Sequence, residues 1–125
     1  MSWVEQTISE FGASVGIDAL SLNDAGVVTL QFEQLGTLYI ERRNEEILIY
    51  LVRDVEHPDA ALFRRVLSCC HHQHHHPFPV HAGLRGETSI VFLIRMPEAD
   101  FILPNLERAM NLLDQLHSEV LAVNS

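Results

Sequence analysis

The stretch Ile47-Leu48-Ile49-Tyr50-Leu51-Val52 decides the fold of this chain. It places six apolar or amphipathic residues in a row, rich in β-branched and aromatic types, between two charged pairs. Such a run is too short for a buried helix and is typical of a strand. Successive strand side chains point to opposite faces, so neither face of this strand is polar. The strand therefore needs apolar cover on both sides.

The flanking sequence predicts further strands around this one. After the turn Asn23-Asp24-Ala25-Gly26, apolar and polar residues alternate through Phe32, and a second alternating stretch follows Gly36. Three strands joined by such short loops predict an antiparallel meander. Farther along, 80–84 reads as a short strand and 88–96 as a longer one with two apolar faces.

Three amphipathic stretches predict helices. The first begins at Trp3, behind a capping box of Ser2 and Glu5, and stops at Gly16. The second opens at 57–59 and fades through 71–76, and the last runs from about residue 105 to 122. The order α-βββ-α-ββ-α predicts an α+β fold, a single domain over 1–125 with an antiparallel sheet.

The supply of apolar faces leaves two interpretations open. We expect the first and third helices to cover one sheet face, which leaves the short second helix to cover the other. Either the three helices wrap the whole sheet, or another polypeptide completes the cover. An open sheet edge can also accept an added strand.

Composition excludes several classes of function. The 125 residues carry eight basic and seventeen acidic side chains, a formal charge of −9, which argues against a nucleic-acid or anionic-membrane partner. The longest apolar runs have strand length, which predicts no membrane span. The first residues lack the pattern of a signal peptide, and the adjacent cysteines Cys69 and Cys70 do not indicate a disulfide framework, so we expect a cytoplasmic protein.

A histidine run offers the alternative of a histidine-rich metal-binding protein. It consists of His71, His72, His74, His75 and His76. Imidazole and thiolate ligands suit zinc, nickel or copper, and several pairs here are four residues apart. A site also needs convergent ligands, which a helix end beside Pro77 does not offer. We therefore interpret the run as solvated and predict no metal site.

We find no catalytic constellation and predict no enzyme and no cofactor. The neighbours Cys70 and His71 do not face one another on a helix. A glycine-rich loop ahead of a helix, as phosphate binding requires, is missing from the sequence. Acidic pairs such as Glu45-Glu46 fall at turns and read as solvated ends of strands.

Several short segments resemble the SycN-like class I type III secretion chaperones in the same order along the chain. These segments are Met1-Ser2-Trp3-Val4-Glu5, Gly36-Thr37-Leu38, Ala82-Gly83-Leu84-Arg85-Gly86-Glu87, Leu103-Pro104 and Glu119-Val120-Leu121-Ala122. The histidine run departs from that family. The resemblance implies the same order of elements and a chaperone without nucleotide. It also implies pairing with a YscB-like chaperone subunit, as a heterodimer or else as a homodimer. The pair would hold the N-terminal region of a YopN-like secreted gatekeeper protein in extended form.

The resemblance also implies where partners bind. Client contacts are expected on the first helix and the meander, at Trp3, Phe11, Leu30, Phe32, Leu38 and Ile40. The subunit interface is expected on the second helix and the neighbouring short strand, at Leu62, Phe63, Val66, Leu67, Val80 and Leu84. Each of these apolar residues has the alternative of being internal core.

Overall fold

The computed structural model describes residues 3–17, 20–33, 35–55, 59–69, 78–86 and 88–122. Its elements are α1 (Trp3–Ser14), β1 (Val27–Phe32), β2 (Gly36–Arg43), β3 (Glu46–Asp54), α2 (Ala60–Cys69), β4 (Val80–Arg85), β5 (Ser89–Pro97), the short 3-10 helix η1 (Glu98–Asp100) and α3 (Leu103–Ala122). The α+β class and the order α-βββ-α-ββ-α predicted from the sequence are confirmed.

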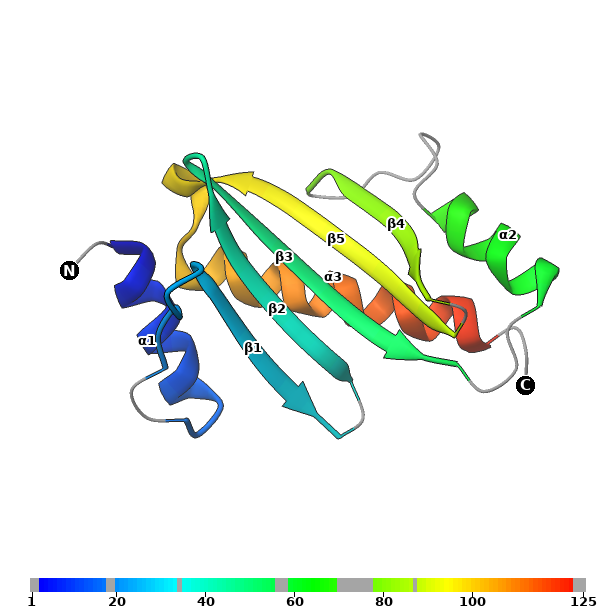
Figure 1. The fold of residues 1–125 in the computed structure, drawn as a ribbon, viewed down its shortest axis with the longest axis horizontal. Helices are drawn as coiled ribbons and strands as arrows, with labels where there is room; N and C mark the ends of the chain where they lie inside the picture. Colours follow the sequence, from blue (N-terminus) through cyan, green and yellow to red (C-terminus); the bar gives the residue numbers. More distant parts are fainter. Residues whose placement is uncertain are drawn as a thin grey trace.

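The five strands form one antiparallel sheet in the order β1-β2-β3-β5-β4. β3 lies at the centre, between β2 and β5, as its two apolar faces predict. Figure 1 shows the sheet with α3 behind it and the strands β1 and β4 at its two edges.

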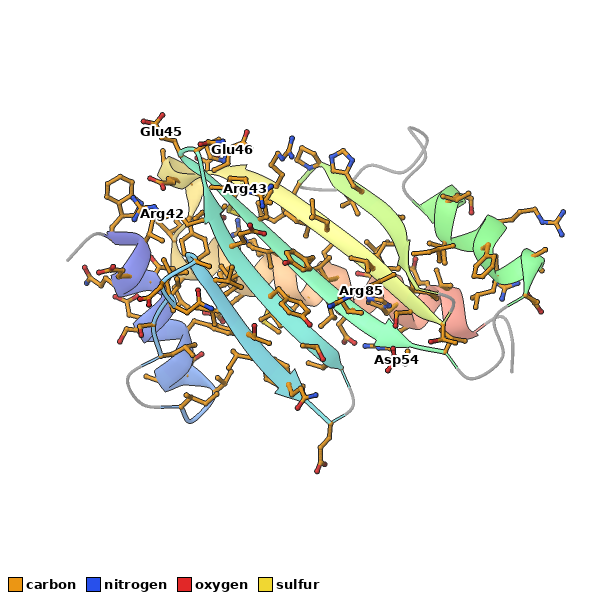
Figure 2. All side chains as sticks on the ribbon, in the orientation of Figure 1. Arg42, Arg43, Glu45, Glu46, Asp54 and Arg85 are labelled. Carbon is orange, nitrogen blue, oxygen red and sulfur yellow. The ribbon has the colours of Figure 1, made fainter. Side chains whose placement is uncertain are left out.

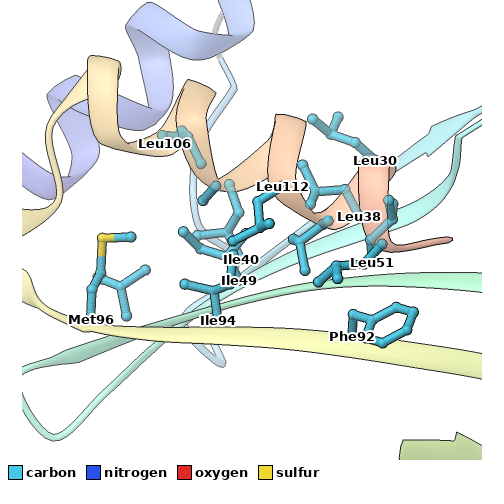
Figure 3. Packing of buried hydrophobic residues seen from close by; sticks show 14 of the residues in the cluster. Leu30, Leu38, Ile40, Ile49, Leu51, Phe92, Ile94, Met96, Leu106 and Leu112 are labelled. Atoms are coloured by element: carbon cyan, nitrogen blue, oxygen red, sulfur yellow. The ribbon is translucent and has the colours of Figure 1, made fainter. Parts of the chain in front are cut away.

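The core lies between the sheet and the helices α1 and α3. The central strand contributes Ile47, Ile49 and Leu51 to the core, each 0% exposed. α3 contributes residues such as Leu106 and Leu113, which are also fully buried. Figure 3 shows these layers meeting. Burying an aliphatic side chain of this size stabilises the fold by about 1.5–3 kcal/mol. The predicted cover of one sheet face by the first and third helices is therefore confirmed.

The second helix does not cover the other sheet face, contrary to the expectation from the sequence. α2 packs against α3 and β4, and its Leu62 and Val66 belong to the same core as the other helices. All three helices thus lie on one side of the sheet, with α2 beside the β4 edge (Figure 1). The apolar stripe of the ten-residue helix α2 is buried against α3 and β4, so no apolar side remains to cover the other sheet face.

The helix ends follow their local chemistry. Gly16 has φ +84° and follows the end of α1, and the Asp59 side chain accepts the backbone N–H of Leu62 at 2.7 Å at the start of α2. α3 begins two residues before the predicted start at 105. Pro104 lies within its first turn, where a missing N–H breaks no helical bond. Within the described residues, no helix is long and apolar enough to span a membrane.

A two-residue turn joins β2 to β3, and its second residue is unusual. Arg43 pairs with Glu46, and the residues between them, Asn44 and Glu45, have φ +52° and +65°. Two positive φ values define a type I′ turn, which favours asparagine first and glycine second. Asn44 meets that preference. Glu45 has a Cβ in the left-handed region, which costs roughly 1–2 kcal/mol.

His117 is fully buried in α3 beneath the centre of the sheet. Its Nε2 lies 2.8 Å from the carbonyl oxygen of Leu51, so this nitrogen carries the hydrogen and donates it. The ring packs edge-on against Phe92, with centroids 4.8 Å apart. Nδ1 is buried without a hydrogen-bond partner. Burial, with a smaller effect of Arg53, lowers the pKa of His117 from 6.5 to about 4.

This low pKa predicts a loss of stability in acid. Above pH 6.5 the histidine is neutral in both states, whereas between pH 6.5 and 4 the unfolded chain takes up a proton that the folded chain refuses. The wild type should lose about 3 kcal/mol of unfolding free energy over that range through this group alone. His117→Gln keeps a donor for the Leu51 carbonyl but does not titrate. Urea unfolding at several pH values should give a shallower slope for this variant, and His81→Gln, at an exposed histidine, should keep the wild-type slope.

The turn at Glu45 predicts a stabilising substitution. Glu45→Gly should raise the unfolding free energy by about 1 kcal/mol, because glycine adopts positive φ without a steric penalty. Glu46→Gly, one residue later in β3, should instead lower it by about 0.5–1 kcal/mol. Chemical denaturation of the two variants checks the pair, and a destabilised Glu45→Gly would contradict the prediction.

Candidate functional site

The sheet face opposite the helices carries a band of apolar and aromatic side chains. The pairing registers place Tyr39, Tyr50 and Leu93 side by side across three strands. We define the open-face band as Tyr39, Leu48, Tyr50, Val52, Val91 and Leu93. Within the described residues no helix packs on this face. The members of the band are buried or half-buried in the single chain, so the band is an apolar sheet face without a helix over it. Apolar surface gathered on one face in this way marks candidate sites of association.

The band is partly covered by its own side chains. The rings of Tyr39 and Tyr50 stack with centroids 4.8 Å apart and an interplanar angle of 15°. Arg85 reaches from β4 to donate from Nη1 to the Tyr39 hydroxyl at 3.0 Å, with its guanidinium 5.5 Å from the ring centroid (Figure 2). Leu48 and Val52, on either side of Tyr50, are only 7% and 8% exposed. Desolvation raises the pKa of Tyr50, so this phenol stays neutral.

Ion pairs border the band. Arg43 pairs with Glu41 at 2.7 Å and Arg95 with Glu46 at 3.3 Å. Exposed pairs of this kind contribute at most about 1 kcal/mol each, so they set the polarity of the rim more than its stability. An apolar centre with a polar rim is the composition of a protein-binding surface.

A groove of about 700 Å³ opens at the loop that joins β1 to β2, beside the end of β3. It is lined by Gln31, Phe32, Glu33, Gly36, Thr37, Arg53 and Asp54. The Arg53 side chain in this groove is held by two hydrogen bonds. Its Nε donates to the Leu35 carbonyl at 3.0 Å, and its Nη2 donates to the Asp114 carboxylate of α3 at 3.1 Å. Gly36 is required here, because a Cβ would lie 2.3 Å from the Val52 carbonyl oxygen.

Both edge strands leave backbone groups free. Within the described residues β1 pairs only with β2, and β4 only with β5. The backbone N–H of Arg42 donates to the Gly26 carbonyl, so Gly26 is a hydrogen-bonded position of the β1–β2 ladder. Such positions alternate along an antiparallel strand, and the backbone groups of Thr29 and Gln31 therefore point away from β2. The outer edge of β1 can therefore accept an added strand.

Four of the six predicted client residues lie in the core of the subunit. Phe11 of α1 and the strand residues Leu30, Leu38 and Ile40 are at most 7% exposed and belong to the core between the sheet and the helices. Trp3 is 52% exposed, and Phe32 is half-buried. These two lie at opposite ends of the sheet, Trp3 near the β2–β3 turn and Phe32 at the β1–β2 loop. The structure therefore does not gather the six predicted residues into one surface.

The predicted subunit residues divide in a similar way. Leu62 and Val66 belong to the core, and Val80 packs partly buried against it. Leu67 on α2 is 64% exposed and Leu84 on β4 is 50% exposed. Phe63 is half-buried between these extremes. α2 and β4 contact each other, so the outward residues Leu67 and Leu84 belong to one side of the molecule.

Sequence analysis did not single out the open-face band as a site. The apolar residues on both faces of β3 and β5 already indicated this surface. Because the second helix was expected to cover it, these residues were not predicted as a binding site. The Arg85–Tyr39 contact joins residues 46 positions apart and has no sequence signature. Among the described residues no group of three potential metal ligands converges, and the histidine run at 71–76 lies outside them.

Comparisons with known proteins agree with this architecture. The family described as type III secretory system chaperone SycN matches residues 3–121. The chaperone protein SycN of Yersinia enterocolitica is 30% identical over 123 residues, which cover 98% of this chain and 99% of that protein. SycN of Yersinia pseudotuberculosis matches with the same identity and coverage.

Solved structures share the fold. A chain in the crystal structure of the ExsC–ExsE complex superposes with a TM-score of 0.72 at 25% identity, covering 91% of this chain and 88% of that one. A chain in the structure of the Yersinia pestis type III secretion chaperone SycH with a YscM2 fragment gives 0.67 at 12% identity, with 92% and 98% covered. The sequence matches extend over nearly the whole chain and the fold agrees, and the chain therefore belongs to the SycN family of type III secretion chaperones.

Proposed function

We propose that this chaperone pairs with a YscB-like subunit in the cytoplasm, at the inner face of the secretion apparatus. The pair binds the N-terminal region of a YopN-like gatekeeper protein in extended form and keeps it competent for secretion. The observation that carries the proposal is the open-face band, which no described helix covers, between two edge strands with free backbone groups.

The proposed pairing surface consists of α2 and the helix-side face of β4. Leu67 and Leu84 are large apolar side chains that are half exposed or more in the single chain. Leu84 pairs with the buried Ile90, so its side chain lies on the helix side of the sheet together with α2, opposite Val91 and Leu93 of the open-face band. Burying apolar side chains at this end stabilises a pair by roughly 25 cal/mol for each Å² removed from water, before the cost of association.

The client surface is placed at the β1 edge of the sheet. An extended segment adds a strand through the outward backbone groups of Thr29 and Gln31, and an apolar side chain enters the groove beside Phe32. Ordering such a segment costs several kcal/mol, which about 1,000–3,000 Å² of buried surface offsets in complexes of this type. Binding of this kind uses no cofactor and no catalytic residue.

Replacing Leu67 by aspartate should abolish pairing. The side chain is 64% exposed, so the substitution leaves the fold intact but buries a charge at the interface. We expect the mass of the co-expressed complex, measured by light scattering after size exclusion, to fall to that of the single subunits while the helical signal stays constant. Mass also separates a pair of unlike subunits from a pair of copies.

Ile102→Asp is the matched control for pairing. Ile102 is 48% exposed and precedes α3, away from α2 and β4. This variant should pair as the wild type does. Equal loss of pairing in both variants, or none in Leu67→Asp, would place the interface elsewhere.

Replacing Thr29 by proline should weaken client binding at least tenfold. Proline removes one outward N–H from the β1 edge and leaves the β1–β2 ladder intact. The measurement is fluorescence anisotropy of a labelled N-terminal gatekeeper segment titrated with the purified pair. Thr29→Ala keeps the N–H and should bind as the wild type does, so equal affinities of the proline and alanine variants would exclude strand addition at this edge.

A further inference from the structure

A second, smaller groove lies at the other end of the sheet, outside the proposed pairing and strand-addition surfaces. It has a volume of about 320 Å³ and is lined by Trp3, Glu45, Pro97, Glu98 and Ala99. These residues come from the start of α1, the β2–β3 turn and the η1 segment. The Glu45 carbonyl accepts the backbone N–H of Glu98 at 3.0 Å, which ties the turn to η1.

Trp3 is held in place at this groove although it is half exposed. Its indole Nε1 donates to the Glu98 carbonyl at 3.0 Å, and 52% of its surface remains open to solvent. The hydrogen bond fixes the plane of the ring. A fixed, exposed indole face attracts cations through its quadrupole, and tryptophan does so better than tyrosine or phenylalanine.

Glu45 supplies the negative charge. Its three acidic neighbours are neutralised, because Glu41 pairs with Arg43, Glu46 with Arg95 and Glu98 with Arg42. Glu45, at the tip of the turn in Figure 2, has no ion-pair partner among the described residues. It also occupies a position where glycine would avoid the steric penalty of positive φ. Strain retained at a position of this kind points to a use for the side chain.

We propose that this groove binds an arginine or lysine side chain of the secreted client, with the cation on the face of Trp3 and paired with the Glu45 carboxylate. Charge complementarity supports this occupant, since the chain carries a formal charge of −9 and its eight basic residues are all arginines. The assignment rests on the proposed client-holding function, and it adds a second anchor at the end of the sheet opposite Phe32.

The single tryptophan of the chain makes the groove directly observable. The probe is the peptide acetyl-Gly-Leu-Arg-Leu-Gly-amide, with the citrulline peptide of equal shape and no charge as its control. We expect the arginine peptide to shift the Trp3 indole N–H resonance in a saturable titration, at least fivefold more tightly than the citrulline peptide. Equal binding of the two peptides would show an apolar groove and overturn the proposal.

Two charge-matched variants separate a site from the general field of the protein. Glu45→Gln and Glu46→Gln each remove one negative charge at neighbouring positions, but only Glu45 lines the groove. Glu45→Gln should weaken the arginine peptide at least fivefold, and Glu46→Gln less than twofold. Equal effects of the two variants would show that the peptide responds only to the net charge of the protein, and would overturn the proposal.

The same variants distinguish this inference from the proposed function. If the purified pair binds the labelled gatekeeper segment and Glu45→Gln changes neither peptide nor client affinity, the groove assignment fails and the chaperone assignment stands. If the arginine peptide binds through Glu45 but no gatekeeper segment binds the pair, the groove is a cation site and its assignment to the client fails with the proposed function.

Discussion

One-sided cover of the sheet is the constraint on which the rest of the structure depends. β3 is apolar on both faces, and the sheet places it at the centre, where both faces need protection. The helices bury the central part of one face, with Ile47, Ile49 and Leu51 at 0% exposed. On the other face no described helix covers the sheet, and only side chains of the strands themselves shield it from solvent. A stacked tyrosine pair and the long Arg85 side chain cover part of the band, and the remainder stays half-buried without a helix over it.

The charge distribution is compatible with an apolar sheet face that no described helix covers. A formal charge of −9 makes copies of the chain repel one another, which opposes unspecific association through the band. The arginines on the open face are engaged locally, by Glu41, by Glu46 and by the Tyr39 ring. In the proposed complex a partner therefore meets an apolar centre whose nearest charges are already balanced. Under the proposed function, specificity then depends on the few groups that remain unbalanced, of which Glu45 is one.

The sequence was sufficient to predict the elements and their order. It left open which face of β3 and β5 is core, because both faces of these two strands are apolar. The left-handed stop at Gly16 has a local cause, so it could be predicted from the sequence. The start of the second helix was predicted at 57–59, whereas α2 begins at Ala60, behind the Asp59 cap. The position of α2 could not be predicted from the sequence, because its apolar stripe fits equally well against α3 or against the sheet. Contacts between distant residues also escaped prediction: Trp3 and Glu98 are 95 positions apart, and neither carries a signature of the other.

The candidate site was predicted less well, for a physical reason. An apolar residue at strand spacing predicts burial but does not say whether the burying atoms belong to the same chain. Leu38 and Ile40 have the same pattern whether a helix of this subunit or a client covers them, and here α1 and α3 do. Exposed residues such as Leu67 and Leu84 could be separated from core residues such as Leu62 only once the packing of α2 was known.

The distance between the two grooves bears on the conformation of a bound client. β2 runs from Gly36, beside the Phe32 groove, to Arg43, beside the turn that carries Glu45. Eight residues of strand span about 26 Å, at roughly 3.3 Å for each residue. An extended client segment covers that length with about eight residues, whereas a helix would need about seventeen. Only the extended form also presents backbone groups to the β1 edge, because a helix satisfies its own. A client anchored at both grooves and bonded to this edge is therefore held as a strand, the conformation that leaves it unfolded.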